Sequence, residues 1–267
     1  MPEIPFLTLA ALTRDVDNAG SDDRLNVTIN VAGTDVAIAE FVADHPRAQG
    51  YLRRAEAVVS FESTSLTDSS VRIGTRGDDA WAPQHIFLFG QTSRGNVVPI
   101  AMETDLTQWL STDVGEGRLT VPLRLVALGG SDIPIRRLLL LVRTADEDDA
   151  DTNSLVQLQI KANGNLLFSE VMTDTPQDDL ERGLSNWYSF NVSPPFTMHD
   201  FSLGHGEITL TILGDDAWLP ASLFLFGLDT ASGRPAHVVP IVSLPRWTFG
   251  TLSTDQGEGS KVVRLPA

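Results

Sequence analysis

The 267-residue chain contains no cysteine. Disulfides and thiolate metal sites are therefore excluded. Its longest unbroken apolar run, at 138–142, falls far short of the ~20 residues that a membrane-spanning helix needs. No basic residue precedes the first apolar stretch, which carries Glu3 nearby, so the N-terminus does not have the pattern of a signal peptide. We therefore expect no transmembrane segment, and a protein that is either cytoplasmic or exported by a non-classical route.

Basic residues are also scarce. The chain has 19 Lys and Arg against 35 Asp and Glu, which gives a formal net charge of −16 and a pI near 4.5. Such an acidic surface repels phosphate backbones and anionic lipids. Nucleic acid is thus excluded as a partner, and an anionic membrane would need a bridging cation.

Known catalytic motifs are missing as well. The sequence has no H-E-x-x-H, G-x-S-x-G, P-loop or dinucleotide fingerprint. We expect no enzymatic activity. A carboxylate-based glycan-active enzyme is the remaining enzymatic alternative, because only geometry reveals such a pair. The five histidines do not recur at matching positions of the two halves described next: His45, His85, His199, His205 and His237.

The sequence does contain segments that occur twice along the chain. The segment GDDAWAPQHIFLFG at 77–90 returns as GDDAWLPASLFLFG at 214–227, identical at ten of fourteen positions. LSTDVGEG at 110–117 returns as LSTDQGEG at 252–259, and the order of the motifs is the same in both halves. This pattern predicts an internal duplication. We expect one domain over residues 1–128 and a second over 133–267, with a short polar break between them.

Within each half the hydrophobic periodicity is that of β-strands. The segment 25–31 alternates apolar and polar residues, and so does 156–160. No amphipathic helix of ten or more residues is evident; the nearest candidate, 35–44, reads equally well as a strand. The predicted fold class is all-β, with two tandem antiparallel β-sandwiches.

The repeated GDDAW-x-P motif has a structural interpretation. Glycine would take a positive φ and close a turn, the aspartates would cap that turn, and tryptophan would fill the end of the core. Proline would then open the next strand, where a missing donor is tolerated. The positions are Gly77, Trp81 and Pro83 in the first half, and Gly214, Trp218 and Pro220 in the second.

The motifs together resemble the PLAT (lipoxygenase-homology) β-sandwich family, which has a glycine–small–Asp turn before a V-x-V strand and a tryptophan before a late strand. The matching residues are Ala19, Gly20, Ser21, Asp22, Val27, Ile29, Gly33 and Trp81, then Ala150, Thr152, Asn153, Leu158, Ile160, Gly164 and Trp218. Asp151 and Asn153 replace Gly20 and Asp22. If Gly20 needs a positive φ, the second half must build this turn differently.

The resemblance implies calcium sites in the end loops. Calcium takes six to eight oxygen ligands, and these loops are rich in carboxylates. Solvated acidic loops without metal are the alternative interpretation. The candidate ligands are Asp15, Asp17, Asp22, Asp23, Asp78 and Asp79 in the first half, and Asp146, Asp148, Asp151, Asn153, Asp215 and Asp216 in the second.

These observations favour a non-catalytic binding or interaction module whose end loops bind a protein, glycan or lipid partner. If the end loops hold calcium, the ion would assist this binding. Two copies would allow bivalent binding. The alternative is a structural subunit of a larger assembly that binds no small ligand. Trp109 and Trp247 lie shortly before the LSTD segments, where they would either contact a ligand at the rim or pack in the core.

Overall fold

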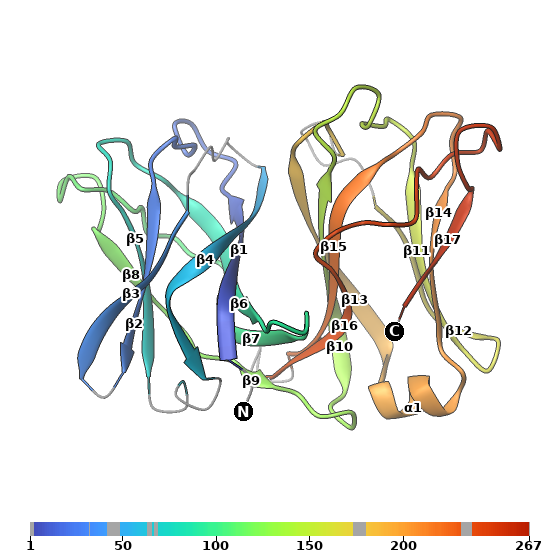
Figure 1. The fold of residues 1–267 in the computed structure, drawn as a ribbon, viewed down its shortest axis with the longest axis horizontal. Coiled ribbons are helices and arrows are strands. Elements are labelled where there is room, and N and C mark those ends of the chain that lie inside the picture. The colour runs from blue at the N-terminus through green and yellow to red at the C-terminus, as the bar shows by residue number, and fades with distance from the viewer. Residues whose placement is uncertain are drawn as a thin grey trace. The chain divides into compact units, whose positions relative to one another are not determined.

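A computed structural model describes residues 3–31, 33–41, 49–62, 66, 69–172, 180–230 and 237–266. The chain divides into two compact units, Met1–Ala127 and Leu128–Ala267. Each unit is described separately below, and Figure 1 shows the strands of each arranged in two layers.

Unit 1 is an antiparallel sandwich of two four-stranded sheets. The first has the order β7-β6-β1-β4, and the second β3-β2-β5-β8. Its strands are β1 (Glu3–Thr13), β2 (Leu25–Val31), β3 (Thr34–Phe41), β4 (Gly50–Glu62), β5 (Ser70–Thr75), β6 (Pro83–Gln91), β7 (Val97–Glu103) and β8 (Thr120–Leu123).

Unit 2 has the same strand order in its two sheets, β16-β15-β10-β13 and β12-β11-β14-β17. A two-residue strand, β9 (Ala127–Leu128), lies at the division between the units. The remaining elements are β10 (Ile135–Thr144), β11 (Val156–Ala162), β12 (Asn165–Met172), β13 (Ser185–Phe196), α1 (Met198–Leu203), β14 (Glu207–Ile212), β15 (Pro220–Asp229), β16 (His237–Leu244) and β17 (Val262–Leu265).

Alternation of side chains explains why these segments pair as they do. In β2, Leu25, Val27 and Ile29 are fully buried, while the residues between them face outward. The register with β5 sets Val27 opposite Ile73 and Ile29 opposite Val71, so the apolar side chains of both strands share the core face. A register shift of one residue would expose all of them.

The apolar run of β6 is divided between the two faces of its sheet. Ile86 and Leu88 belong to the core of unit 1, together with Trp81. Phe87 and Phe89 lie on the other face, where their ring centroids are 5.1 Å apart. The division between alternate residues is the one that the sequence predicts for a strand.

The all-β fold class is confirmed. The N-terminal segment forms a strand of eleven residues, and the ambiguous segment at 35–44 is a strand as far as it is described, to Phe41. The described residues contain one helix, α1, six residues long. None of the described helical structure is long and apolar enough to cross a membrane.

Candidate functional site: the loop end of each unit

Three loops meet at one end of unit 1: the loop after β1, the GDDAW loop before β6, and the LSTD loop before β8. Trp81 and Leu110 exchange two backbone hydrogen bonds, each of 2.8 Å, which join the GDDAW and LSTD loops. The Ala82 N–H donates to the Ala19 carbonyl at 3.0 Å and so joins the GDDAW loop to the loop after β1. We call this region the loop end of unit 1.

Tryptophan fixes the loop end to the core in both units. Trp81 and Trp218 are fully buried, as the sequence predicts. The indole N–H of Trp81 donates to Thr13 Oγ1 at 3.0 Å, and that of Trp218 donates to Thr144 Oγ1 at 3.1 Å. Each threonine is the last residue of the first strand of its unit. The indole therefore ties the GDDAW loop to the start of the loop after that strand, while its ring packs in the core of the sandwich.

The Asp23 side chain is the centre of the loop end of unit 1. Its buried carboxylate accepts hydrogen bonds from the Asp79 backbone N–H at 2.9 Å and from Thr75 Oγ1 at 3.2 Å. A Cβ on Gly77 would fall on this carboxylate. The prediction that Gly77 takes a positive φ is therefore wrong: glycine is needed here because the Asp23 carboxylate approaches the backbone closely.

Ser154 takes the corresponding place in unit 2. Its hydroxyl accepts from the Asp216 backbone N–H at 3.1 Å, and a Cβ on Gly214 would come within 2.7 Å of the Ser154 Cβ and closer still to its hydroxyl. Gly214 also lacks a positive φ. The Asp216 carboxylate accepts from the Asn153 N–H at 3.0 Å. A side-chain acceptor in the first loop thus holds the GDDAW turn in both units.

The LSTD loops complete each loop end. Thr112 donates to the Gly77 carbonyl at 2.7 Å, and Thr254 donates to the Gly214 carbonyl at 3.1 Å. Asp113 accepts from the Gly115 N–H at 2.7 Å, and Asp255 accepts from Gly257 at the same distance. These aspartates therefore stabilise their own turns.

The turn after the first strand has a left-handed residue at the same position in both units. Asn18 and Asp149 each have a φ of 59°, while Gly20 has no positive φ. The replacement of Gly20 by Asp151 therefore requires no different turn, because the left-handed residue lies two positions earlier. Asparagine and aspartate tolerate this region better than other non-glycine residues.

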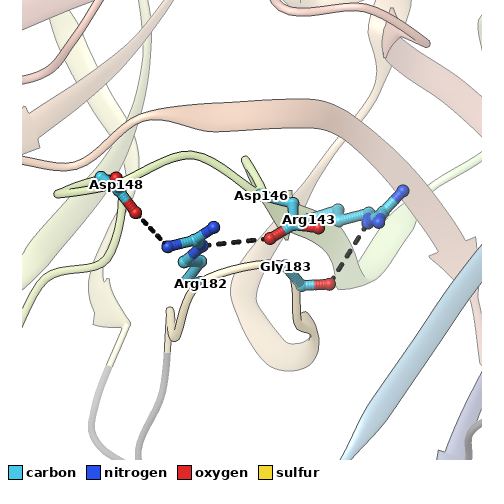
Figure 2. Close-up of polar contacts among 5 residues, drawn as sticks. All are labelled: Arg143, Asp146, Asp148, Arg182 and Gly183. Carbon is cyan, nitrogen blue, oxygen red and sulfur yellow. Dashed lines mark hydrogen bonds and ion pairs between the residues drawn. The ribbon is translucent and has the colours of Figure 1, made fainter.

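An arginine neutralises part of the acidic loop of unit 2. Figure 2 shows Arg182 between Asp146 and Asp148. Its Nε lies 3.0 Å from Asp146 Oδ1, and its Nη1 bonds to Asp148. The hydrogen bond to Asp146, then that to Asp148, raises the pKa of Arg182, partly offset by desolvation. Nearby, Arg143 Nε donates to the Gly183 carbonyl at 3.3 Å.

The structure brings several candidate calcium ligands together at each loop end, but not as a preformed cation cage. The described residues hold no group of three or more His, Asp or Glu side chains placed to bind a metal ion. Asp23 and Asp216 accept hydrogen bonds from backbone N–H groups, and Asp146 and Asp148 bind Arg182. The remaining candidates lie on exposed or partly exposed loop residues: Asp15, Asp17, Asp22, Asp78, Asp79, Asp151, Asn153 and Asp215. As described, this donor set does not fit calcium without loop movement.

The two loop ends differ in one pair of exposed residues. In unit 1 the Arg76 N–H donates to the Arg24 carbonyl at 3.0 Å, and both guanidinium groups lie within 4 Å of Glu40, at 3.7 and 3.8 Å. In unit 2 the same backbone hydrogen bond, 2.8 Å long, joins Leu213 to Leu155. Both leucines are about half exposed, at 47% and 48%. Equivalent backbone positions thus present charge in one unit and apolar surface in the other.

The sequence did not single out Arg14. Its Cζ lies 5.2 Å from the centroid of the Trp109 ring. Trp109 is partly exposed at the rim of unit 1, whereas Trp247 is buried in the core of unit 2 and donates to the Gly250 carbonyl at 2.6 Å. The core-packing interpretation therefore holds for Trp247, whereas contact of the partly exposed Trp109 with a ligand stays a prediction.

Comparisons with known proteins add little. No protein-family model matches the chain, and no curated protein does. Among solved structures, one similar chain is described as the two C2 domains, A and B, of extended-synaptotagmin 2. The identity is 12%, with 81% of this chain and 75% of that chain covered, and the TM-score is 0.13. A TM-score this low supports no argument about function.

Proposed function

We propose that the protein is a non-catalytic binding module that meets its partner through the loop ends of its two units. One observation carries this proposal. The same hydrogen bonds hold both loop ends in place, while the exposed residues on that framework differ: Arg24 and Arg76 in unit 1, Leu155 and Leu213 in unit 2. A fixed scaffold with variable exposed loop residues is typical of binding surfaces.

The different surfaces imply different contacts. Arg24 and Arg76 would bind acidic or hydrogen-bonding groups, whereas Leu155 and Leu213 would bury apolar surface. We also infer that the units arose by duplication and are PLAT-like. The support is the matching sequence motifs and the shared strand order. Two sites in one chain would let modest individual affinities combine.

Calcium enters this proposal for unit 1 alone. In unit 2 Arg182 already neutralises Asp146 and Asp148. In unit 1 the residues Asp22, Asp78 and Asp79 are exposed, and a loop movement that gathers them would create an oxygen-rich site. Calcium at about 1 mM should then raise the melting temperature, whereas Mg²⁺ should not. This rise should disappear in Asp78→Asn and persist in Asp148→Asn.

A binding screen tests the main proposal. The probes are a displayed peptide library, a glycan array and phosphatidylcholine–phosphatidylserine vesicles, each with calcium or EDTA. Binding to any probe should weaken in Arg24→Ser/Arg76→Ser or in Leu155→Ser/Leu213→Ser. Matched controls are Arg94→Ser in unit 1 and Leu203→Ser in unit 2, which change exposed residues far from the loop ends.

The outcomes of this screen are distinct. Binding that the loop-end variants reduce and the controls retain would support the module. Binding that survives every loop-end variant would refute it. If no probe binds and light scattering shows a discrete oligomer, the structural-subunit alternative takes its place.

A further inference from the structure

The loop end of unit 1 holds an arginine with two side-chain nitrogens that make no hydrogen bond. Arg14 follows β1, and its backbone N–H donates to the Ala82 carbonyl at 2.9 Å. Its Nε and Nη2 atoms are buried and have no hydrogen-bond partner. Partial burial lowers the pKa of this guanidinium through desolvation. Buried donors without partners destabilise a fold, so this arrangement calls for an explanation.

The fold itself does not require this arginine. The corresponding residue of unit 2 is Ala145, whose N–H donates to the Leu219 carbonyl at 2.9 Å just as Arg14 donates to Ala82. The fold does not require Trp109 either. The Trp109 carbonyl accepts from the Arg118 N–H at 2.9 Å, and in unit 2 the Thr251 carbonyl accepts from the Ser260 N–H at 3.0 Å. Arg14 and Trp109 are thus a pair added to unit 1 on a backbone that unit 2 builds with alanine and threonine.

The two unpaired nitrogens of Arg14 indicate which chemical group could bind there. The Nε–H bond and one Nη2–H bond are parallel along one edge of the planar guanidinium, and they form the fork that binds a carboxylate through two parallel hydrogen bonds. The Trp109 ring, 5.2 Å from Arg14 Cζ, supports the guanidinium from one face. Because Arg14 as a whole is only partly buried, rotation over this ring would present the fork to solvent.

The charge around Arg14 further limits which anions could bind there. Asp15 follows Arg14 and Asp17 lies two residues further on in the same exposed turn, and the chain has a net charge of −16. A dianionic phosphate would be repelled more strongly here than a singly charged carboxylate. We propose that Arg14 and Trp109 form a carboxylate-binding subsite at the loop end of unit 1. This inference rests on the proposed function, and it names the chemical group that unit 1 recognises.

The test is a titration of the whole chain with sodium acetate in place of sodium chloride at constant ionic strength. The readouts are the NMR signal of the Arg14 Nε–H group and the melting temperature. The signal should shift to saturation, and the melting temperature should rise. Sodium glutamate should act in the same way, which would extend the site to larger carboxylates, and phosphate should act more weakly.

Variants locate the effect. Arg14→Ala and Trp109→Thr introduce the residues that unit 2 has at these positions, so both should fold. Arg14→Ala should weaken acetate binding by about tenfold or more, the loss expected for hydrogen bonds to a charged group. Arg94→Ala, which removes an exposed arginine of unit 1 in the turn between β6 and β7, should leave it unchanged.

An Arg14 signal that acetate does not move, or an equal acetate response in wild type and Arg14→Ala, would overturn the inference. Stronger binding of phosphate than of acetate would also overturn it. These results leave the proposed function standing if the peptide, glycan or vesicle screen still depends on the loop-end residues. Failure of that screen together with a positive acetate titration would refute the module and leave a small-molecule carboxylate site.

Discussion

Substitution of Gly77 by alanine tests the role that the structure gives to the GDDAW motif. The new Cβ would fall on the Asp23 carboxylate and displace it from the Asp79 N–H and from Thr75. Hydrogen bonds to a charged group contribute about 1.5–3 kcal/mol each, so losing both, with partial relaxation, should lower the free energy of unfolding of unit 1 by about 3 kcal/mol. Gly130→Ala, in unit 2, is the control for an added methyl group alone, because nothing lies within 4 Å of its added Cβ and its φ is not positive.

Urea unfolding combined with native-state hydrogen exchange measures the loss separately for each unit. The decisive comparison is a double-mutant cycle with Asp23→Ala. Once the carboxylate is gone, the added Cβ of Gly77→Ala has room, so the two losses should be far from additive. A loss below about 0.5 kcal/mol for Gly77→Ala alone, or two additive losses, would refute the reasoning.

Three further predictions concern single side chains. Burial raises the pKa of Tyr51, so its contribution to stability is present below the unfolded pKa of about 10 and is lost as the pH rises toward the folded pKa. Above pH ~10, urea titrations should therefore show the free energy of unfolding falling faster in wild type than in Tyr51→Phe, by up to about 1.4 kcal/mol per pH unit. Trp218→Phe should lower the free energy of unfolding of unit 2 by about 2–3 kcal/mol, because it leaves a cavity and removes the hydrogen bond to Thr144. A decrease of only about 1 kcal/mol, the value of the hydrogen bond alone, would mean that the ring does not fill the core. Arg182→Ala should lower the melting temperature at low salt but not at 1 M salt, since its partners are exposed; an equal loss at both salt concentrations would contradict an ion-pair role.

The sequence was sufficient to predict the sandwich fold, because alternation in segments such as Leu25–Val31 depends only on neighbours two residues apart. Burial of Trp81 and Trp218 was predictable for a similar reason: one large ring recurs beside the same apolar strand. The role of Gly77 was not. It depends on Asp23, more than fifty residues away in the chain, and serine takes that place in unit 2.

The predicted metal ligands show the same limit. Clustered aspartates indicate where negative charge gathers, but not which partner neutralises it. Arg182 lies 36 residues from Asp146, and no local pattern connects them. No motif pointed to Arg14, because its interest lies in hydrogen bonds that are not made. Comparison of the two halves offers one signal in retrospect, since Arg14 and Trp109 are both replaced in the second half, by Ala145 and Thr251.

The central claim is that one framework of hydrogen bonds holds both loop ends while their exposed residues differ. Amide hydrogen exchange at Asp79 and Asp216 tests it most directly, because their N–H groups bond to the side chains of Asp23 and Ser154. The account predicts slow exchange at both amides, with protection of Asp79 alone lost in Asp23→Ala and protection of Asp216 alone lost in Ser154→Ala. Exchange of both amides at the rate of an unprotected loop in the wild-type protein would contradict it.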